Sequence, residues 1–265
     1  MKFRIRKRYL WKWLKLNRVI TDEVRLIINE RGWHITAVDP AHIILGITHL
    51  PPSAFVSYPS LTDEKITLGF PLHGIRNFLP YCIYDDIVEI DFNEEDKKYN
   101  LKWERLNDEN LLCEHVGMCD PSVPDLKYSG EILNLPNRDL RMILKIGKKK
   151  KKDGIQFEWI DDTILKINTV KCTVNDYIRV ESSTIKYDLD EEDISLKRIG
   201  NPDMDNGSFK AIFARDYLKT ISESIGKNDI IDRIRLRGDY PIEITISGDE
   251  NKYNAKFILA PRIKD

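Results

Sequence analysis

The chain lacks any apolar run near the roughly 20 residues that a membrane-spanning helix requires. Its N-terminus is basic but has no uninterrupted apolar stretch of the kind found in a signal peptide. Cysteine is scarce: Cys82, Cys113, Cys119 and Cys172 show neither CxxC spacing nor a nearby pair of histidines. This pattern indicates reduced thiols and no structural metal. We therefore expect a soluble intracellular protein.

Net charge is also nearly absent, because 42 basic residues meet 43 acidic ones and leave a formal charge of −1. Any affinity for nucleic acid must then come from charges that are segregated on the surface and not from overall basicity. The apolar fraction of 42% is enough for a substantial core, and 265 residues allow one large domain or two of ordinary size.

Catalytic motifs are missing as well. The five histidines are spread along the chain without HxH or HExxH spacing, and neither GxxxxGK[ST] nor GxGxxG occurs. The acidic pairs Asp85-Asp86 and Asp161-Asp162 could suggest a two-metal nuclease. Both pairs stand beside turn signals between strands, which favours a role as solvated turns. We predict a protein that is not an enzyme and that has no cofactor and no metal.

Strand patterns dominate what is present, separated by turn residues and interrupted by four short amphipathic helices. In the first half, strands are predicted at 23–29, 33–38, 43–50, 65–70, 86–92 and 99–105, with helices at 7–19 and 72–80. In the second half, strands are predicted at 154–160, 163–168, 176–180, 185–189, 208–214, 231–236, 242–247 and 253–259, with helices at 137–146 and 215–225. The repeated order of elements indicates an internal duplication. The non-periodic segment GMCDPSVPDLK, residues 117–127, has the composition of a connector.

Basic residues recur on the polar side of all four predicted helices. They are Arg8, Lys12 and Lys15 on the first, Arg76 on the second, Arg138, Arg141 and Lys145 on the third, and Arg215 and Lys219 on the fourth. The third helix is followed by five consecutive lysines, Lys148–Lys152. Acidic residues cluster instead in DFNEED (91–96) and DLDEED (188–193), in turns between strands. Charge sorted in this way suits a surface that faces phosphate. The ordinary alternative, a solvated outer face on each helix, stays open from the residues alone.

Three segments carry a resemblance to a known family. AVDPAHIILGITHLP (Ala37–Pro51), VPDLKY (Val123–Tyr128) and the C-terminal KFILAPRIK (Lys256–Lys264) resemble an early turn and strand, the interdomain connector and the terminus of sliding clamps. These are the archaeal and eukaryotic clamps of the proliferating cell nuclear antigen (PCNA) type. The resemblance implies an α+β fold of two similar domains, residues 1–116 and 129–265, joined by a connector at 117–128. Each domain would have antiparallel sheets outside and two short helices lining a central pore.

The resemblance also implies a function in DNA replication and repair. Such a clamp is a polymerase processivity factor that encircles duplex DNA as a trimeric ring without reading its sequence. The basic helix residues named above, together with Lys148 and Lys149, would then face the DNA. Weak phosphate attraction is sufficient for a ring that retains DNA topologically, and tight contacts would stop it from sliding.

A second implied surface is a hydrophobic pocket for short peptide motifs of a replicative DNA polymerase, a flap endonuclease and a DNA ligase, with a clamp loader as a further partner. Its predicted wall consists of Val38, His42, Ile43, Met118, Val123, Pro124, Pro241, Ile258, Ala260 and Pro261. Small apolar groups and prolines can accept an aromatic anchor with little reorganisation. The apolar C-terminal strand must be held in place for this purpose, since a free terminus of this kind would fray.

Ring closure in this family pairs edge strands of neighbouring subunits. The predicted interface residues are Leu111, Leu112, Cys113 and His115 on one strand and Tyr177, Ile178 and Val180 on the other. Pairing across subunits would also protect apolar edges from aggregation.

The chain departs from the family pattern in two places. The first is the basic start MKFRIRKRYLWKWLK, in which Trp13 joins the apolar stripe and Trp11 falls beside it, partly exposed. The second is DGIQFEWIDDTILKIN, which keeps GIQF but lacks the glycines expected to follow. Such divergence also fits one subunit of a heteromeric replication or checkpoint clamp, or a monomeric clamp-like adaptor. We expect a cytoplasmic protein associated with the nucleoid in an archaeon, or a nuclear protein in a eukaryote.

Overall fold

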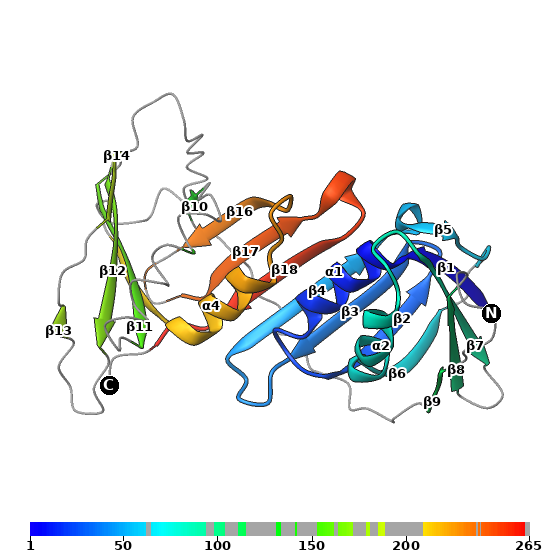
Figure 1. Ribbon diagram of the computed structural model, residues 1–265. Helices are drawn as coiled ribbons and strands as arrows, with labels where there is room; N and C mark the ends of the chain where they lie inside the picture. The colour runs from blue at the N-terminus through cyan, green and yellow to red at the C-terminus, as the bar shows by residue number, and fades with distance from the viewer. Residues whose placement is uncertain are drawn as a thin grey trace. The chain divides into compact units, whose positions relative to one another are not determined.

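The computed structural model describes residues 1–61, 65–93, 98–103, 111–114, 131–133, 141, 153–161, 164–171, 179–180, 185–188, 209–236, 238 and 240–262. The chain forms two compact units (Figure 1). Unit 1 comprises Met1–Val123 and Ser247–Ala255, and unit 2 comprises Pro124–Ile246 and Lys256–Asp265. The connector predicted at 117–128 lies outside the described residues, so the predicted domain boundaries stay a prediction.

Unit 1 contains two groups of antiparallel strands. The first runs in the order β4 (Ile44–Leu50), β3 (Gly32–Val38), β2 (Glu23–Asn29) and β6 (Ile66–Pro71). The second runs in the order β5 (Phe55–Ser57), β1 (Lys2–Arg6), β7 (Ile87–Asn93), β8 (Lys98–Trp103) and β9 (Leu111–Glu114). Buried and more exposed side chains alternate along β1, β2 and β7, and along β3 from Trp33 onward, as expected when one face covers a core.

An aromatic cluster fills the core of unit 1. Trp33 of β3 is fully buried, and its ring lies 5.2 Å from Phe3, 5.8 Å from Trp13 and 5.7 Å from Phe92, all edge to face. The four rings come from β3, β1, β7 and the first helix, so the cluster joins both strand groups to that helix. Edge-to-face ring pairs add about 0.5–1.5 kcal/mol each beyond the burial of their area.

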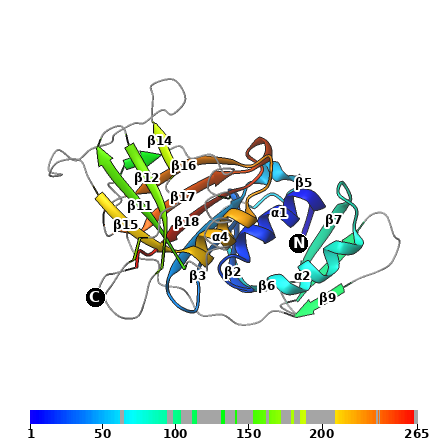
Figure 2. The same cartoon turned by 60° about the vertical axis from the view of Figure 1, so that its left-hand side comes forward.

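Helices α1 (Lys7–Asn17) and α2 (Leu72–Phe78) lie on one face of the β4-β3-β2-β6 strands (Figures 1 and 2). The predicted apolar stripe of α1 is confirmed, because Leu10, Trp13 and Leu14 are buried. Trp11 stands beside this stripe with 37% of its surface exposed, as expected. Helix α2 ends two residues before Pro80, and a 3₁₀ turn at Leu79–Tyr81 contains that proline.

A buried hydrogen-bond chain attaches α1 to the sheet. The Asn17 side chain, fully buried, donates to the Trp13 carbonyl at 2.9 Å and accepts from the Thr48 hydroxyl of β4 at 2.8 Å. Apolar packing alone would allow a helix to rotate on a sheet, whereas these directional bonds select one orientation.

The turn between β3 and β4 is organised by Asp39, which is 5% exposed. Its carboxylate accepts from the backbone N–H groups of Ile43 at 2.7 Å and Ile44 at 2.8 Å. These bonds hold His42 in the left-handed region, at φ 56°. The turn therefore has a defined shape at the start of β4.

Unit 2 also contains two groups of strands and a helix. One group runs in the order β13 (Arg179–Val180), β12 (Ile164–Lys171), β11 (Gly154–Asp161) and β15 (Phe209–Ala214), with β14 (Ile185–Asp188) also paired to β12. The other runs in the order β10 (Glu131–Leu133), β16 (Ile230–Leu236), β17 (Ile242–Ser247) and β18 (Asn254–Leu259). Helix α4 (Arg215–Ser224) buries Leu218 and Ile221, and Figure 1 shows it lying along β17 and β18.

Unit 2 buries the carboxylate of Glu243 between two strands that carry cations. Glu243 of β17 is 3% exposed, with Arg235 of β16 at 3.6 Å and Lys256 of β18 at 3.5 Å. Cations on both neighbouring strands compensate the carboxylate, which would be costly to bury alone.

The expected α+β fold is confirmed, and most predicted strands agree with the observed ones to within two residues. The prediction missed β1, β5 and β10. Of the strand predicted at 176–180, residues 179–180 form β13, and residues 176–178 lie outside the described ranges. The predicted helix at 137–146 lies outside the described residues except for Arg141, which is helical. None of the helices in the described ranges is long and apolar enough to cross a membrane.

We predict that Asn17→Ala lowers the free energy of unfolding by about 2 kcal/mol, because it removes two buried hydrogen bonds and leaves the buried Thr48 hydroxyl without its Asn17 acceptor. Denaturant unfolding measures this loss. Thr21→Ala, at a hydroxyl that accepts one exposed backbone bond, serves as the control and should cost less than about 0.5 kcal/mol. Thr48→Val in the Asn17→Ala background should recover part of the loss. A cost for Asn17→Ala as small as that of the control would contradict the role of the bond chain.

Asp39→Ala should destabilise the β3–β4 turn, with a loss of about 2–3 kcal/mol, because charge-assisted bonds to the partly buried Ile43 amide and the buried Ile44 amide disappear. Hydrogen exchange of the Ile43 and Ile44 amides should accelerate together with the fall in stability. Asp39→Asn retains an acceptor oxygen and should lose about half as much. Unchanged exchange at both amides in the alanine variant would show that the carboxylate does not hold the turn.

Candidate nucleic-acid interface and partner-peptide pocket

Helix α1 is unusually basic for its position. Its eleven residues, KRYLWKWLKLN, contain four cations and no acid, and Lys7 and Arg8 stand in the first turn. Cations at a helix N-terminus oppose the helix dipole at a cost of about 0.3–1 kcal/mol each. Helix stability therefore does not explain this charge. Lys15 is exposed, Lys12 is half-buried, and Arg8 donates to the Tyr9 hydroxyl and pairs with Asp85 at 3.3 Å.

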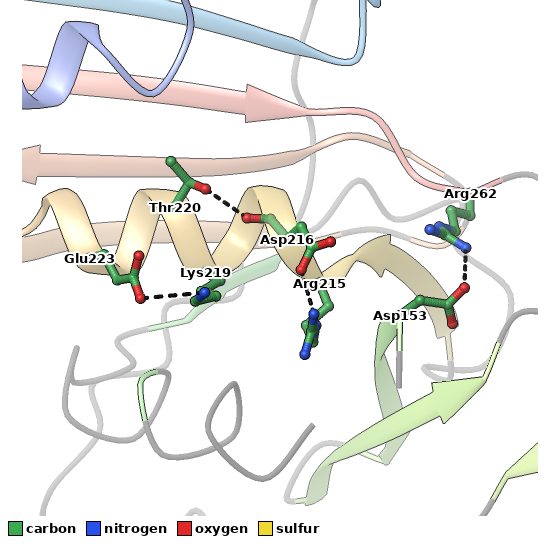
Figure 3. Close-up of polar contacts among 7 residues, drawn as sticks. All are labelled: Asp153, Arg215, Asp216, Lys219, Thr220, Glu223 and Arg262. Carbon is green, nitrogen blue, oxygen red and sulfur yellow. Dashed lines mark hydrogen bonds and ion pairs between the residues drawn. The ribbon is translucent and has the colours of Figure 1, made fainter. Parts of the chain in front are cut away.

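Helices α2 and α4 carry a cation at the same place, four residues after the helix begins. Arg76 pairs with Asp22 at 3.7 Å, and Lys219 pairs with Glu223 at 3.7 Å. Arg215, at the start of α4, pairs with its neighbour Asp216 at 2.5 Å (Figure 3). Exposed ion pairs of this kind contribute only about 0–1 kcal/mol. A phosphate group can therefore take the place of the carboxylates at little cost.

Arg141 is engaged differently. Its guanidinium donates to the carbonyl of Ser222 at 3.1 Å and to the carbonyl of Ile225, both at the C-terminal end of α4. The last carbonyls of a helix lack partners within it and attract cations. The guanidinium thus stabilises the end of α4, and a contact of Arg141 with DNA stays a prediction. Of the other predicted DNA-facing residues, Arg138, Lys145, Lys148 and Lys149 lie outside the described ranges.

The residues predicted for the peptide pocket are distributed over both units. In unit 1, Val38 and Ile43 are half-buried and His42 is exposed, all at the Asp39 turn. In unit 2, Ile258 is 9% exposed, while Pro241, Ala260 and Pro261 are half-buried. Met118, Val123 and Pro124 are not among the described residues. The pocket itself therefore stays a prediction.

The segment after β18 is held down at Arg262. Its backbone N–H donates to the carbonyl of Ile212 on β15 at 2.7 Å, and its guanidinium binds Asp153 at 3.2 Å (Figure 3). These contacts fix Ala260 and Pro261 against unit 2 and confirm that the C-terminal segment is tethered. The sequence reading gave no role to Arg262, although a cation next to an apolar strand end could have signalled an anchor.

The strands proposed for subunit pairing are terminal in their groups. Among the described strands, β9 is hydrogen-bonded only to β8, and β13 only to β12. Leu111, Leu112 and Cys113 lie on β9 and Val180 lies on β13. His115, Tyr177 and Ile178 are outside the described residues. Subunit pairing through these two strands stays a prediction.

Titratable groups do not converge on a catalytic arrangement in the described part of the chain. His34 of β3 and His49 of β4, treated as scattered in the sequence, face each other across the strands and stack at 4.3 Å. Burial, reinforced by His49 and Arg31, lowers the pKa of His34 to about 4, so its imidazole is neutral. Asp86 accepts from the Ile83 backbone at 2.7 Å, which confirms its role in a turn. The described residues contain no cluster of three or more His, Cys, Asp or Glu that could hold a metal.

One acidic cluster differs from expectation. Asp91 belongs to β7, not to the turn after it, and pairs with the N-terminal ammonium at 3.2 Å and with Lys2 at 4.0 Å. This agrees with the strand predicted at 86–92 and not with the turn predicted for DFNEED, because the alternation of IVEIDFN continues through Asp91. Residues 94–97 and 189–193 of the two acidic segments lie outside the described ranges.

Comparison with known proteins gives a consistent result. No protein-family model matches the chain. Among curated proteins, the DNA polymerase sliding clamp of Methanosarcina barkeri is 29% identical over 248 residues, covering 93% of this chain and 91% of the relative. The clamp of Methanococcoides burtonii is 27% identical over 251 residues, with the same coverage of both chains. The clamp of Natronomonas pharaonis is 25% identical over 249 residues, covering 93% and 92%.

Solved structures show the same fold. PCNA of A. fulgidus, bound to the C-terminal region of FEN-1, matches with a TM-score of 0.78 and 20% identity, covering 100% of this chain and 99% of that chain. A chain of the PCNA2-PCNA3 complex from Sulfolobus tokodaii matches with a TM-score of 0.77 and 14% identity, covering 99% of both. The sequence likeness spans nearly the whole chain, and the fold agrees over its full length. The chain thus belongs to the PCNA family of DNA polymerase sliding clamps, non-enzymatic proteins of DNA replication.

Proposed function

We propose that this chain is a sliding clamp that encircles duplex DNA as a three-subunit ring and recruits replication and repair enzymes through a peptide pocket. The proposal places it with the cytoplasmic replication machinery of an archaeon, at the nucleoid. The ring, the DNA contacts and the pocket go beyond the family assignment.

The observation that carries the DNA contact is the charge on α1. This helix has four cations and no acid in a chain whose net charge is −1. Lys7 and Arg8, in the first turn, also contact the Cys82 carbonyl and Asp85 within the chain. The support for a phosphate partner is therefore the concentration of positive charge on one helix. Lys12, Lys15, Arg76 and Lys219 stand on rigid helices with long, mobile side chains. Such groups attract phosphates in any sequence without binding tightly enough to stop sliding.

Two observations support the peptide pocket. The Asp39 carboxylate fixes the turn that carries Val38, His42 and Ile43, and Arg262 tethers the segment with Ala260 and Pro261. Both walls are therefore pre-organised, which reduces the entropy lost on binding a peptide. The PCNA of A. fulgidus was solved with the C-terminal region of FEN-1 bound. By analogy, we propose a flap endonuclease, the replicative polymerase and DNA ligase as clients of this chain, and a clamp loader as the protein that opens its ring.

Ring closure is supported by the terminal strands β9 and β13. Each has one hydrogen-bonded neighbour among the described strands, so its outer edge offers backbone groups to a second chain. An antiparallel pair between β9 of one subunit and β13 of the next would repeat head to tail and close a ring.

A heteromeric ring is the second candidate. The Sulfolobus tokodaii structure is a complex of two different PCNA chains. The basic start of this chain and its loss of glycines after GIQF would fit one specialised subunit of such a ring. The two candidates differ in whether the chain closes a ring without other subunits.

We expect Lys12→Glu combined with Lys219→Glu to lower polymerase processivity at least about tenfold, because the change replaces phosphate attraction by repulsion on one helix in each unit. Primer extension on a singly primed template, with cognate polymerase and clamp loader, measures the product length. Binding of a client peptide should not change.

Arg31→Glu combined with Lys210→Glu makes the same charge change at exposed sites off the helices and should leave processivity nearly intact. Pro261→Asp should have the reverse effect of the helix variant, abolishing peptide binding while the chain is still retained on circular DNA. Equal loss of processivity in the helix variant and its charge-matched control would contradict the assignment of the helices to DNA.

A further inference from the structure

A hollow of about 100 Å³ lies between α1 and α2 in unit 1. It is lined by Trp11, Leu14, Lys15, Arg18, Asp22, Leu72 and Arg76. Trp11, Lys15 and Arg18 follow one another at i, i+4 and i+7, so they form one stripe along the edge of α1 that faces α2. Leu72 and Arg76 form the opposite wall at i and i+4. The hollow therefore belongs to the same helix face as the proposed DNA contacts.

Trp11 is the unusual member of this site. A large aromatic ring with 37% of its surface exposed leaves apolar area in contact with water, while Trp13, two residues later, is fully buried. The aromatic and cation–π contacts found among the described residues do not involve Trp11. Its ring face is therefore available for stacking, and Leu14 and Leu72 provide an apolar floor beside it.

Positive charge surrounds the ring. Three cations, Lys15, Arg18 and Arg76, line the hollow together with a single acid, Asp22. Asp22 forms a surface ion pair with Arg76 at 3.7 Å. Arg18 is exposed at the end of α1. The site thus combines one stacking surface with a net positive rim, the combination with which proteins bind single-stranded nucleic acid.

We propose that this hollow binds an unpaired base of single-stranded DNA, which stacks on Trp11 while Lys15, Arg18 and Arg76 contact the adjoining phosphates. The inference rests on the proposed function in one respect, namely that the helix face meets DNA. Duplex DNA alone does not explain the site, because paired bases are stacked on each other and offer phosphates and sugars to a basic helix. An unpaired base exposes a ring face that Trp11 can cover.

The consequence is a preference for places where duplex and single strand meet. A clamp held only by phosphate attraction slides equally well along any duplex. A clamp with this site would be held longer beside a gap or a primer end, where an unpaired base can enter the hollow. Positioning at such an end would be sequence-tolerant, because every base has a ring face that can stack.

The test measures binding of the full chain to a fluorescein-labelled thymidine oligonucleotide of about eight residues, by anisotropy at low salt. The matched probe has the same length and phosphates but abasic sites in place of the bases. We expect the wild-type chain to bind the thymidine probe about tenfold more tightly than the abasic probe. Trp11→Ala should remove this ratio without weakening abasic binding, and Trp11→Phe should retain most of it.

Tyr84→Ala, at an exposed aromatic residue of the same unit with 58% of its surface accessible, is the matched control and should leave the ratio unchanged. Thermal unfolding of each variant excludes loss of fold as the cause. A wild-type ratio near one, or a ratio that Trp11→Ala leaves intact, would overturn the proposal. An acidic aromatic peptide that binds at Trp11 without displacing the thymidine probe would assign the hollow to a protein partner instead. That result would also overturn the proposal.

Failure of this site and failure of the clamp function give different results. Retention of the chain on circular duplex DNA after loading tests the ring and does not require an unpaired base. Normal retention with a probe ratio near one refutes only the stacking site. A preserved ratio without retention refutes only the ring.

Discussion

The buried hydrogen bond from the Thr48 hydroxyl to the Asn17 side chain joins helix α1 to the sheet in one orientation, and the bond from Asn17 to the Trp13 carbonyl holds the Asn17 amide in place within the helix. The orientation of every other side chain on the helix follows from them. Leu10, Trp13 and Leu14 are buried, with Trp13 packed against Trp33, and Trp11 and Lys15 are exposed on the other side of the helix. A rotation of one residue would bring Trp11 into the core and expose apolar surface on the far side. The orientation of the basic side of α1 therefore depends on the polar contact between Asn17 and Thr48, which buries little area but is directional.

The outward cations are held in a way that suits transient contact with phosphate. Arg76 and Lys219 occupy the same place in their helices, and each is paired with a nearby carboxylate at the surface. These pairs are weak enough to be exchanged for phosphates, as the proposed DNA contact requires. Arg141 differs, because it holds the end of α4 through two backbone carbonyls. The helices are thus rigid supports, and the weak ion pairs are formed by the tips of the exposed side chains.

Much of this could be predicted from the sequence. Period-2 alternation located β2, β3, β4 and β7 to within two residues, and the helical spacing of Leu10, Trp13 and Leu14 identified the buried face of α1. Short strands were missed because three to five residues carry too little periodicity: β1 was hidden in a basic run, and β5 and β10 have three residues each. The roles of Asp39, Arg262 and the His34–His49 stack depend on contacts between distant positions, which spacing along the chain does not reveal.

The central claim, a ring that this chain closes by itself, is tested most directly by native mass. Light scattering behind a sizing column should be recorded across a range of protein concentrations. Three copies of the 31.0 kDa chain give about 93 kDa, and we predict that mass at all but the lowest concentrations. A mass that stays at 31.0 kDa throughout would contradict a self-closing ring and would favour assembly with different partner subunits.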